Sequence, residues 1–597
     1  MRYSKILILT LMTIVLSGCL KERNESYTTM DNYFHTATQI TTGLNGCYNP
    51  LRTIVQRRDF WEMTDVACDL LSMSGSTVYN ANCDISPARP GVATPIWRYC
   101  YEGVKNTNDM IYAIDQALKR AQELNNNDIT EAEAASLLAE ACVLRSLYYY
   151  ILTCTFGDVP FYAERVTEEN REKLATLPRM SARRTRDFCI DQILEHIVEQ
   201  RALPMVRTYD GTGYRAGAAL GLMIAAKMCL WNERWDDALL FIGELEGIYG
   251  NYASSPETFG IDYPLTDIPF SKRYVKESIF EMGNVVEEFG LQTSSVIASS
   301  CLPSKVTIET VEKARNAANN PSSGSDESGD AIEDVYDEED GEDLVDNSGF
   351  DCYMGICIPE LGGYAKISAS VRPNSYLYGQ LLPYGSNDLR SCEYNGSKTP
   401  RGGSGTLAWE WVGYDPVNDP DRQNPKLLKF WSSKNLDSNN KPTTLKTTSK
   451  PFMGNKFWAY GMHNTKDPNN YKMFRFADAL LMKAEAYLQK KDYDNACRYL
   501  NITRTRAGLE PLSFASVLNE SEALMEEIRM ERAKELVGEF QRKFDLVRWG
   551  IWYERTSMYN EGQYLKGFIR PCHRYWPIPS DQVAYSGNAL DNKEYSE

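Results

Sequence analysis

Histidine is scarce in this sequence, and the short motifs that mark several common chemistries are missing. Only four histidines occur among 597 residues, and none stands at zinc-site spacing from cysteines. The chain has neither a Gly-x-Ser-x-Gly elbow nor a His-Glu-x-x-His motif. Gly211-Thr212-Gly213 lacks the further glycines and the lysine of a phosphate loop, so we expect a turn there. The sequence therefore predicts no metal and no cofactor, and it indicates no catalytic residue.

An excess of positive charge is also missing. The formal net charge is −17, and residues 326–346 hold 12 Asp and Glu but no Lys or Arg. Removing those acids would bring the charge from −17 to −5, so most of the net negative charge lies in this one segment. The chain shows no basic surface pattern, and nucleic acid is therefore not an expected partner. Serine, glycine and acidic residues dominate 316–348, which predicts an exposed, mobile loop. A calcium site is the alternative, but 337–346 lacks the spacing of an EF-hand loop.

Long apolar runs are missing too. Residues 6–16 form an apolar stretch behind Arg2 and Lys5, and its length of about 11 residues is too short for the ~30 Å hydrocarbon core of a bilayer. A basic start, a short apolar core and small residues predict a secretory signal peptide over 1–18. No later segment offers about 18 consecutive apolar residues, so nothing else is expected to span a membrane.

The signal ends in Leu16-Ser17-Gly18-Cys19, which resembles a bacterial lipobox. In a lipobox the cysteine is acylated and becomes the first residue, so we expect a lipid on Cys19 and a polar tether over 19–29. Several acyl chains, at ~0.8 kcal/mol for each buried CH₂, would anchor the protein stably to a membrane. An ordinary secretory signal with a chance cysteine is the alternative.

Helical periodicity fills the two ends of the chain. Apolar spacing predicts helices over 38–55, 96–124 and 130–155, and a long charged helix over 526–549. Pro577-Ile578-Pro579 is expected to end the ordered fold.

Two distant segments, 225–238 and 483–496, are alike. Each has an apolar helix, a short polar turn, an aromatic-Asp pair and a second helix that opens with alanine. Small alanines let two antiparallel helices approach closely, as in a tetratricopeptide helix pair. The copies lie 258 residues apart, so they predict one helical scaffold that is split by an insert.

The predicted insert covers 255–470, between an N-terminal scaffold over 30–254 and a C-terminal scaffold over 471–597. It is rich in Gly, Pro, Ser, Asn, Trp and Tyr, and short runs at 278–282 and 426–431 read as strands. The expected fold class is mainly α: a tetratricopeptide-like helical scaffold with a long insert of irregular structure and small sheets.

Several motifs, in this order, resemble those of the SusD/RagB family of Bacteroidota outer-membrane nutrient-binding lipoproteins. The matching segments are 43–48, 139–150, Phe156-Gly157-Asp158-Val159-Pro160, Glu277-Ser278-Ile279-Phe280-Glu281, Arg372-Pro373, Asp388-Leu389-Arg390, 474–486, 527–536, 544–550 and Tyr575-Trp576-Pro577-Ile578-Pro579. They span nearly the whole mature chain.

The resemblance implies a helical scaffold whose variable insert carries the ligand site. It also implies a partner, a SusC-type TonB-dependent outer-membrane barrel that the lipoprotein covers, and import of an oligosaccharide or, in some members, a peptide. The expected location is the outer membrane, lipid-anchored through Cys19 and facing the cell surface. The acidic stretch 316–348 departs from the family where ligand contacts are usually drawn.

Charged residues stand at helical spacing in the C-terminal scaffold. They are Arg475, Asp478, Glu485, Glu531, Arg532, Glu535, Asp545 and Arg548. One interpretation makes some of the acids a catalytic pair, but glycosidase carboxylates converge on an open cleft at ~5 to 10 Å. We favour buried Arg–carboxylate pairs that lock helices together, since arginine binds carboxylate bidentately.

Aromatic residues with polar neighbours are the best candidates for a ligand site, because sugar rings stack on Trp and Tyr while their hydroxyls bind Asn, Asp and Arg. The N-terminal candidates are Trp61, Tyr79, Asn80, Arg89 and Trp97. The candidates in the insert are Tyr353, Tyr364, Tyr384, Asn387, Trp409 and Trp411. The alternative for each ring is a place in the core, where tryptophan is usually found.

These features favour a protein that binds an oligosaccharide, performs no chemistry and delivers its ligand to the SusC-type transporter. A peptide-binding member of the same family, a glycoside hydrolase and a purely structural lipoprotein are the alternatives.

Overall fold

The computed structural model describes most of the two scaffold parts and separate pieces of the insert. The described residues are 30–73, 75, 78–205, 215–250, 275, 277–284, 297–301, 305–310, 351–353, 371–392, 405–414, 421, 423, 425–429, 451–457 and 470–596. Cys19, the tether and the acidic stretch 316–348 lie outside these residues, so the predictions made for them stand as predictions.

The N-terminal part is helical apart from one short strand. Its elements are α2 (Met30–Tyr33), α3 (Ala37–Gly46), α4 (Asn49–Val55), α5 (Arg58–Trp61), a π-helix (Glu62–Val66), β1 (Leu71–Met73), α6 (Ala93–Leu124), α7 (Glu131–Phe156), α8 (Arg171–Ala175), α9 (Ala182–Ile193), a second π-helix (Leu194–Glu199), α10 (Ala218–Asn232) and α11 (Trp235–Tyr249). The predicted helix over 38–55 is two helices, α3 and α4, separated at Cys47 and Tyr48.

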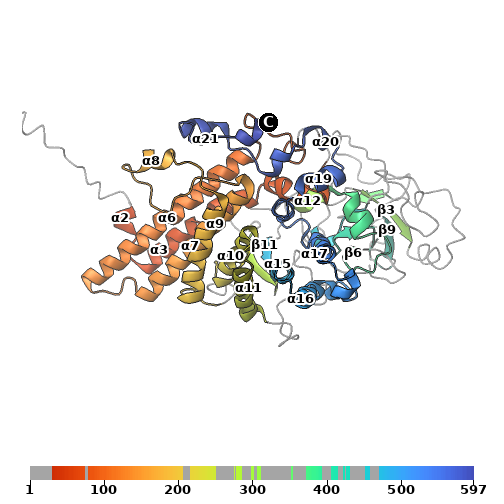
Figure 1. The fold of residues 1–597 in the computed structure, drawn as a ribbon, viewed down its shortest axis with the longest axis horizontal. Coiled ribbons are helices and arrows are strands. Elements are labelled where there is room, and N and C mark those ends of the chain that lie inside the picture. The colour runs from red at the N-terminus through yellow and green to blue at the C-terminus, as the bar shows by residue number, and fades with distance from the viewer. Residues whose placement is uncertain are drawn as a thin grey trace, which may run out of the picture.

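The long helix α7 forms the centre of this part and packs along α6 (Figure 1). It begins with a capping box: Glu133 N donates to Thr130 Oγ1 (3.2 Å), and Thr130 N donates to Glu133 Oε2 (2.9 Å). By length and composition α7 could cross a membrane, but 94% of its most apolar window is buried in the protein. It is therefore a core helix, apolar on every side because helices surround it.

The C-terminal part is again helical. Its elements are β11 (Tyr471–Arg475), α15 (Phe476–Gln489), α16 (Tyr493–Arg506), a 3₁₀ helix (Phe514–Val517), α17 (Ser521–Leu536), α18 (Arg542–Arg548), α19 (Trp552–Tyr559), α20 (Leu565–Phe568), a 3₁₀ helix (Pro571–Arg574), α21 (Ser580–Tyr585) and a last 3₁₀ turn (Lys593–Tyr595). The ordered fold thus continues beyond Pro577-Ile578-Pro579, and the predicted end there is wrong.

The two similar segments form the expected helix pairs, α10 with α11 and α15 with α16. Ala238 and Ala496 are fully buried where the partners of each pair approach, and α11 packs on α15, so the pairs stack on each other. The tetratricopeptide-like scaffold is confirmed. Two parts of the sequence more than 200 residues apart complete one structure.

The insert leaves and re-enters the scaffold at a single place. Strand β2 (Ser278–Met282) opens it and pairs antiparallel with β11, which closes it, with Met282 opposite Tyr471. Between them lie the elements α12 (Ile297–Cys301), β3 (Lys305–Thr310), β4 (Asp351–Tyr353), β5 (Val371–Pro373), a π-helix (Tyr376–Leu381), β6 (Ser391–Cys392), β7 (Leu407–Ala408), β8 (Glu410–Tyr414), β9 (Pro425–Lys429), β10 (Phe452–Met453) and a 3₁₀ turn (Asn455–Phe457).

Small sheets hold the described pieces of the insert together. One has the order β4-β3-β9-β8, another the order β10-β7-β6, and a third pairs β5 of the insert with β1 of the N-terminal part. The predicted strands at 278–282 and 426–431 correspond to β2 and β9. Figure 1 shows the insert strands at the opposite end of the molecule from α3, α6 and α7.

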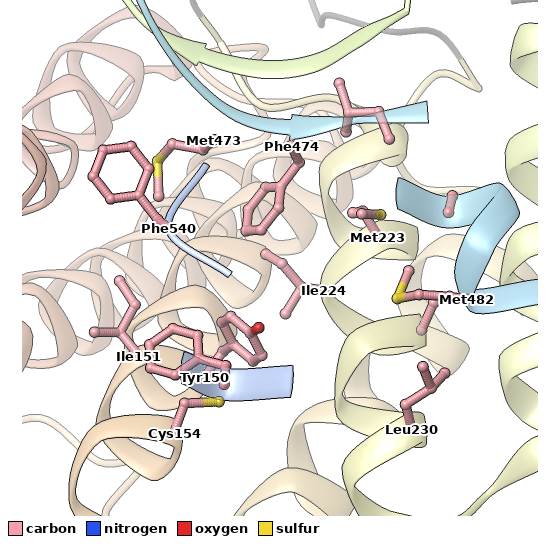
Figure 2. Close-up of a cluster of buried hydrophobic side chains, with 14 of the residues drawn as sticks. Tyr150, Ile151, Cys154, Met223, Ile224, Leu230, Met473, Phe474, Met482 and Phe540 are labelled. Carbon is pink, nitrogen blue, oxygen red and sulfur yellow. The ribbon is translucent and has the colours of Figure 1, made fainter. Parts of the chain in front are cut away.

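One hydrophobic core joins all parts of the scaffold. Tyr150 of α7, Ile224 of α10, Phe474 of β11, Met482 of α15 and Phe540 are buried and belong to the same cluster (Figure 2). The N-terminal part therefore packs against the C-terminal part through this cluster, and its own helices α3, α6 and α7 also enclose a second, smaller cluster.

The predicted helix over 526–549 is wrong, because α17 ends at Leu536 and α18 begins at Arg542. Gly538 and Phe540, in the elbow 537–541 between them, have φ of +78° and +61°. This left-handed region is incompatible with a continuous right-handed helix and suits glycine best.

The elbow 537–541 is a junction between distant parts of the chain. Gly538 N donates to Asp65 Oδ1 at 3.0 Å, and Trp61 Nε1 donates to Gly538 O at 3.1 Å. A Cβ on Gly538 would lie 2.4 Å from the ring of Phe457 in the insert. Glycine is thus required here by the backbone angle and by close packing.

A buried ionic core lies beside this elbow and joins the insert to the scaffold. It consists of Glu277, Asp388, Arg390, Lys456, Arg475, Arg506, Glu531, Lys534, Glu535 and Glu539. Arg475 pairs with Glu277 (2.9 Å), Glu535 (3.0 Å) and Glu539 (2.8 Å).

Arg390 ties the insert to α17 in the same way. Its guanidinium pairs with Asp388 (2.8 Å), Glu531 (2.9 Å) and Glu535 (3.1 Å). Burial alone would raise the pKa of Glu531, but Arg390 and Lys534 hold that pKa at about 2. The Glu531 carboxylate therefore stays ionised at any physiological pH.

The remaining charged residues of the predicted set form a second group. Arg532 pairs with Asp478 (2.9 Å) and Asp545 (2.7 Å), and Arg548 pairs with Asp545 (3.1 Å) and Glu485. Seven of the eight predicted residues are buried, Arg548 is half-buried, and all eight are in contact with an opposite charge. The interpretation as helix-locking ion pairs is confirmed.

Candidate ligand-binding face

The segment that follows β1 presents an aromatic ring with charged neighbours to solvent. Tyr79 is 41% exposed, and the guanidinium of Arg89 lies 5.0 Å from the centre of its ring. Arg89 also pairs with Asp84 at 2.5 Å, and Asp84 N donates to Tyr79 O at 2.9 Å. A ring held in this way can stack on the CH face of a sugar while the charged groups bind its hydroxyls.

Asn80, next to Tyr79, has a structural position. It is buried, its Oδ1 accepts a hydrogen bond from Val92 N at 3.0 Å, and its Nδ2 lies 3.5 Å from Glu62 Oε2. The side chain holds the segment onto the start of α6. The prediction that Asn80 contacts ligand is contradicted by this burial.

Trp61 and Trp97 are core residues as well. Trp61 is 1% exposed and binds the elbow through its indole N–H, while Trp97 is 4% exposed and packs on Tyr101 and Phe156, with ring centres 4.9 and 5.0 Å away. Neither ring is available for stacking on a ligand, so both predictions are wrong. The sequence places them beside loops, but helices cover them.

In the insert the structure brings Tyr384 and Trp409 together. Their ring centres are 5.6 Å apart at an interplanar angle of 77°, and Tyr384 is half-buried. Asn387, three residues on, is exposed. Trp409 itself is 1% exposed, so the expectation of a surface-exposed tryptophan is wrong, and the indole lies beneath Tyr384.

Tyr378 completes this group and was not predicted. It extends from the π-helix Tyr376–Leu381 and meets Trp409 edge-on, with ring centres 6.2 Å apart at 84°. We define Tyr378, Tyr384 and Trp409 as the aromatic cluster. The run of tyrosines at 376, 378 and 384 was visible in the sequence, but a π-helix has no simple periodic signature, so the orientation of Tyr378 could not be derived.

The other predicted residues of the insert remain predictions. Tyr353 lies in β4 and Trp411 in β8, and their side chains are not among the described ones. Tyr364 lies outside the described residues altogether.

The acidic residues that were candidates for a catalytic pair in the C-terminal scaffold do not face an open cleft in the described part of the chain. The carboxylates predicted in the C-terminal scaffold are buried in ion pairs. Within the same described residues, no group of three or more His, Cys, Asp or Glu could hold a metal ion. The chemistry that the described face can offer is stacking and hydrogen bonding.

A tetratricopeptide-like scaffold and an insert anchored by buried ion pairs define a class of mainly helical protein, and the ring of Tyr79 is exposed on its surface. Two family models match the chain: one described as "SusD family" over residues 405–595, and one described as "Starch-binding associating with outer membrane" over residues 20–210. The chain belongs to the SusD/RagB family.

One curated relative supports this assignment. SusD-like protein P25 of Formosa agariphila is 31% identical over 146 residues, which are 24% of this chain. The match spans only 28% of the length of that relative, and it therefore says little about the remainder.

Solved structures share the whole fold. Surface glycan-binding protein A from Bacteroides uniformis is 21% identical, with 94% of this chain and 100% of that chain covered at a TM-score of 0.58. The same-named protein from Bacteroides thetaiotaomicron in complex with laminarihexaose is 19% identical, with 94% and 100% covered at 0.58. A laminarin-binding SusD-like protein is 18% identical, with 92% and 98% covered at 0.58.

Proposed function

We propose that this chain is an outer-membrane surface lipoprotein that binds an oligosaccharide and delivers it, chemically unchanged, to a SusC-type TonB-dependent transporter. The observation that carries the binding role is the exposed ring of Tyr79, held between Arg89 and the segment that contains Asp84. The half-buried Tyr384 and exposed Asn387 offer similar chemistry in the insert. The relatives known by name as glycan-binding or laminarin-binding proteins make a neutral glucan a reasonable first ligand.

Affinity electrophoresis against soluble glycans tests the binding role, with laminarin, starch and xylan as a first panel. At least one glycan should retard the wild-type protein. Tyr79→Ala should weaken that interaction about ten-fold, equivalent to about 1.4 kcal/mol. Tyr585→Ala is the matched control, because Tyr585 is a 76% exposed tyrosine on α21 and is not among the candidate ligand residues.

Three outcomes would contradict the proposal or one of its parts. Equal loss in the Tyr79 and Tyr585 variants would remove Tyr79 from the site. Tight binding to mixed peptides, with none to any glycan, would favour the peptide-binding alternative. Release of reducing ends that stops when one carboxylate is replaced would favour a hydrolase.

The anchor and the partner need separate experiments. Cys19→Ala should give a folded, ligand-competent protein that is lost from the outer surface, and surface proteolysis of intact cells would measure this. Continued surface display of that variant would contradict the lipobox. Purification of the native protein from mild detergent should yield a large TonB-dependent barrel, and its absence would count against the transport role.

A further inference from the structure

Two buried polar atoms of the aromatic cluster have no hydrogen-bond partner. They are Tyr378 Oη and Trp409 Nε1, on side chains that are 4% and 1% exposed. Polar atoms in protein interiors are nearly always paired, and an unpaired one destabilises the fold. Trp552 and Tyr149 follow this rule, since Trp552 Nε1 donates to Ala67 O at 3.0 Å and Tyr149 Oη donates to Tyr162 O at 2.8 Å. Tyr376 Oη and Trp576 Nε1 are further buried aromatic atoms without a partner, but Tyr378 and Trp409 are in ring contact with each other.

The two unpaired atoms belong to side chains that are in contact. Trp409 contacts Tyr378 and Tyr384 edge-on, and the two residues that follow Tyr378 in the π-helix, Gly379 and Gln380, are exposed. Turns of π-helix are rare and are frequently found at functional sites. Unpaired atoms and unusual backbone are independent observations, and they point to the same location.

The two atoms are hydrogen-bond donors at neutral pH. An indole N–H can only donate. Burial raises the pKa of Tyr378, and the negative charge of Glu561 adds to this, so the hydroxyl keeps its proton. Two uncharged donors beside aromatic rings suit the oxygens of a neutral, hydroxyl-rich molecule.

We infer that Tyr378 Oη and Trp409 Nε1 are ligand donors, which bind the oxygens of one neutral sugar unit when Tyr384 moves aside. Tyr384 is the half-buried ring that packs edge-on against Trp409, and it is followed by exposed Gly385 with a φ of +77°. A sugar that enters must displace this ring, which then offers its face for stacking. The inference rests on the proposed glycan-binding function. It adds two hydrogen-bond donors to that function and one ring, Tyr384, that covers them in the free protein.

The variant Tyr378→Phe tests the inference, since it removes only the unpaired oxygen and keeps the ring. In the absence of ligand its melting temperature should rise above that of the wild type. The control Tyr149→Phe removes a paired hydroxyl, so its melting temperature should fall. A fall in Tyr378→Phe equal to that of the control would mean that the hydroxyl has a partner in the free protein, and it would overturn the inference.

Calorimetry then measures affinity for whichever hexasaccharide of laminarin, starch, cellulose or mannan the wild-type protein binds, with hexagalacturonate as the anionic probe. Tyr378→Phe should bind the neutral glycan five- to ten-fold more weakly, and Tyr149→Phe should bind it like the wild type. Unchanged affinity in Tyr378→Phe overturns the inference and leaves the proposed function intact. Binding of hexagalacturonate alone overturns the neutral class. No binding of any probe by the wild type counts against the proposed function and, with it, the inference.

Discussion

The ionic core and the aromatic cluster differ in how far their buried polar groups are paired. In the ionic core, Arg390 and Arg475 each contact three carboxylates. These carboxylates come from the residue before β2, from the segment between the π-helix and β6, from α17 and from the elbow. In the aromatic cluster, a hydroxyl and an indole N–H are buried with no partner at all. The two regions meet in the insert, because Asp388 and Arg390 of the ionic core follow Tyr384 of the aromatic cluster by only a few residues.

The difference distinguishes the residues that attach the insert to the scaffold from the residues that could bind a ligand. Removing one partner of a buried ion pair strands the others, so the ionic core fixes the base of the insert to the scaffold. Unpaired donors destabilise the protein and are retained where a ligand completes them. The insert is therefore fixed to the scaffold at the ionic core, while two donors of the aromatic cluster remain unpaired.

Breaking the ionic core should have the largest effect. Arg475→Met would leave Glu277, Glu535 and Glu539 buried without their common cation, and the free energy of unfolding should fall by about 3–5 kcal/mol. Urea denaturation followed by far-UV circular dichroism measures this. Lys119→Met is the control: its pair with Asp115 is more than half exposed, so the change should stay within about 0.5 kcal/mol. Equal small effects would mean that the ionic core does not hold the insert.

Asp65 is a buried acid without a neighbouring cation among the described residues, so its pKa should shift in the opposite direction from that of the paired Glu531. Burial raises the pKa of Asp65 to about 7, although hydrogen bonds from Thr64 and Gly538 N offset part of the shift. The unfolded value is roughly 4. Between these values the folded state holds a proton that the unfolded state has lost, so stability falls as the pH rises, by about 1.4 kcal/mol per unit, and levels off above 7.

Asp65→Asn should remove this dependence, because the amide keeps the shape of the protonated acid. Its nitrogen can donate to Thr64 Oγ1, whose proton can then go to Phe60 O, 3.0 Å away. The difference in unfolding free energy between wild type and variant, measured from pH 4 to 8, should follow the slope given above. A flat difference would show that Asp65 is ionised throughout.

The elbow should show a smaller effect that separates packing from backbone strain. Gly538→Ala meets Phe457 and also adopts a φ of +78°, whereas Gly550→Ala has almost the same φ, +74°, with open space around its Cβ. We expect about 1 kcal/mol of destabilisation for Gly550→Ala, and a further 1–3 kcal/mol for Gly538→Ala. Thermal unfolding of both variants measures this, and equal shifts would mean that Phe457 moves away without cost.

The ionic core could largely be predicted from the sequence, and the aromatic cluster could not. Arginines and acids at helical spacing, such as Arg532 and Glu535, rarely remain buried unless they pair, so their types and spacing were sufficient. The exposure of a ring depends on what packs over it. Trp61, Trp97 and Trp409 all stand near loops in the sequence, yet each is buried by residues outside its own segment, such as Gly538, Phe156 and Tyr378.

The helical scaffold was predictable for a similar reason, and its interruptions were not. Apolar periodicity located α6, α7 and the helix pairs, because burial of one face determines them. The elbow 537–541 interrupts a continuous charged pattern, and it depends on bonds to Asp65 and Trp61, nearly 500 residues away. Local sequence does not contain that information.

The most direct test of binding without chemistry is a calorimetric titration of the wild-type protein with the glycan that retards it in affinity electrophoresis. Reducing ends are then assayed in the same sample. The account predicts saturable heat, loss of about ten-fold in affinity in Tyr79→Ala, and no new reducing ends. Reducing ends that accumulate with time, or saturable heat that Tyr79→Ala leaves unchanged, would contradict it.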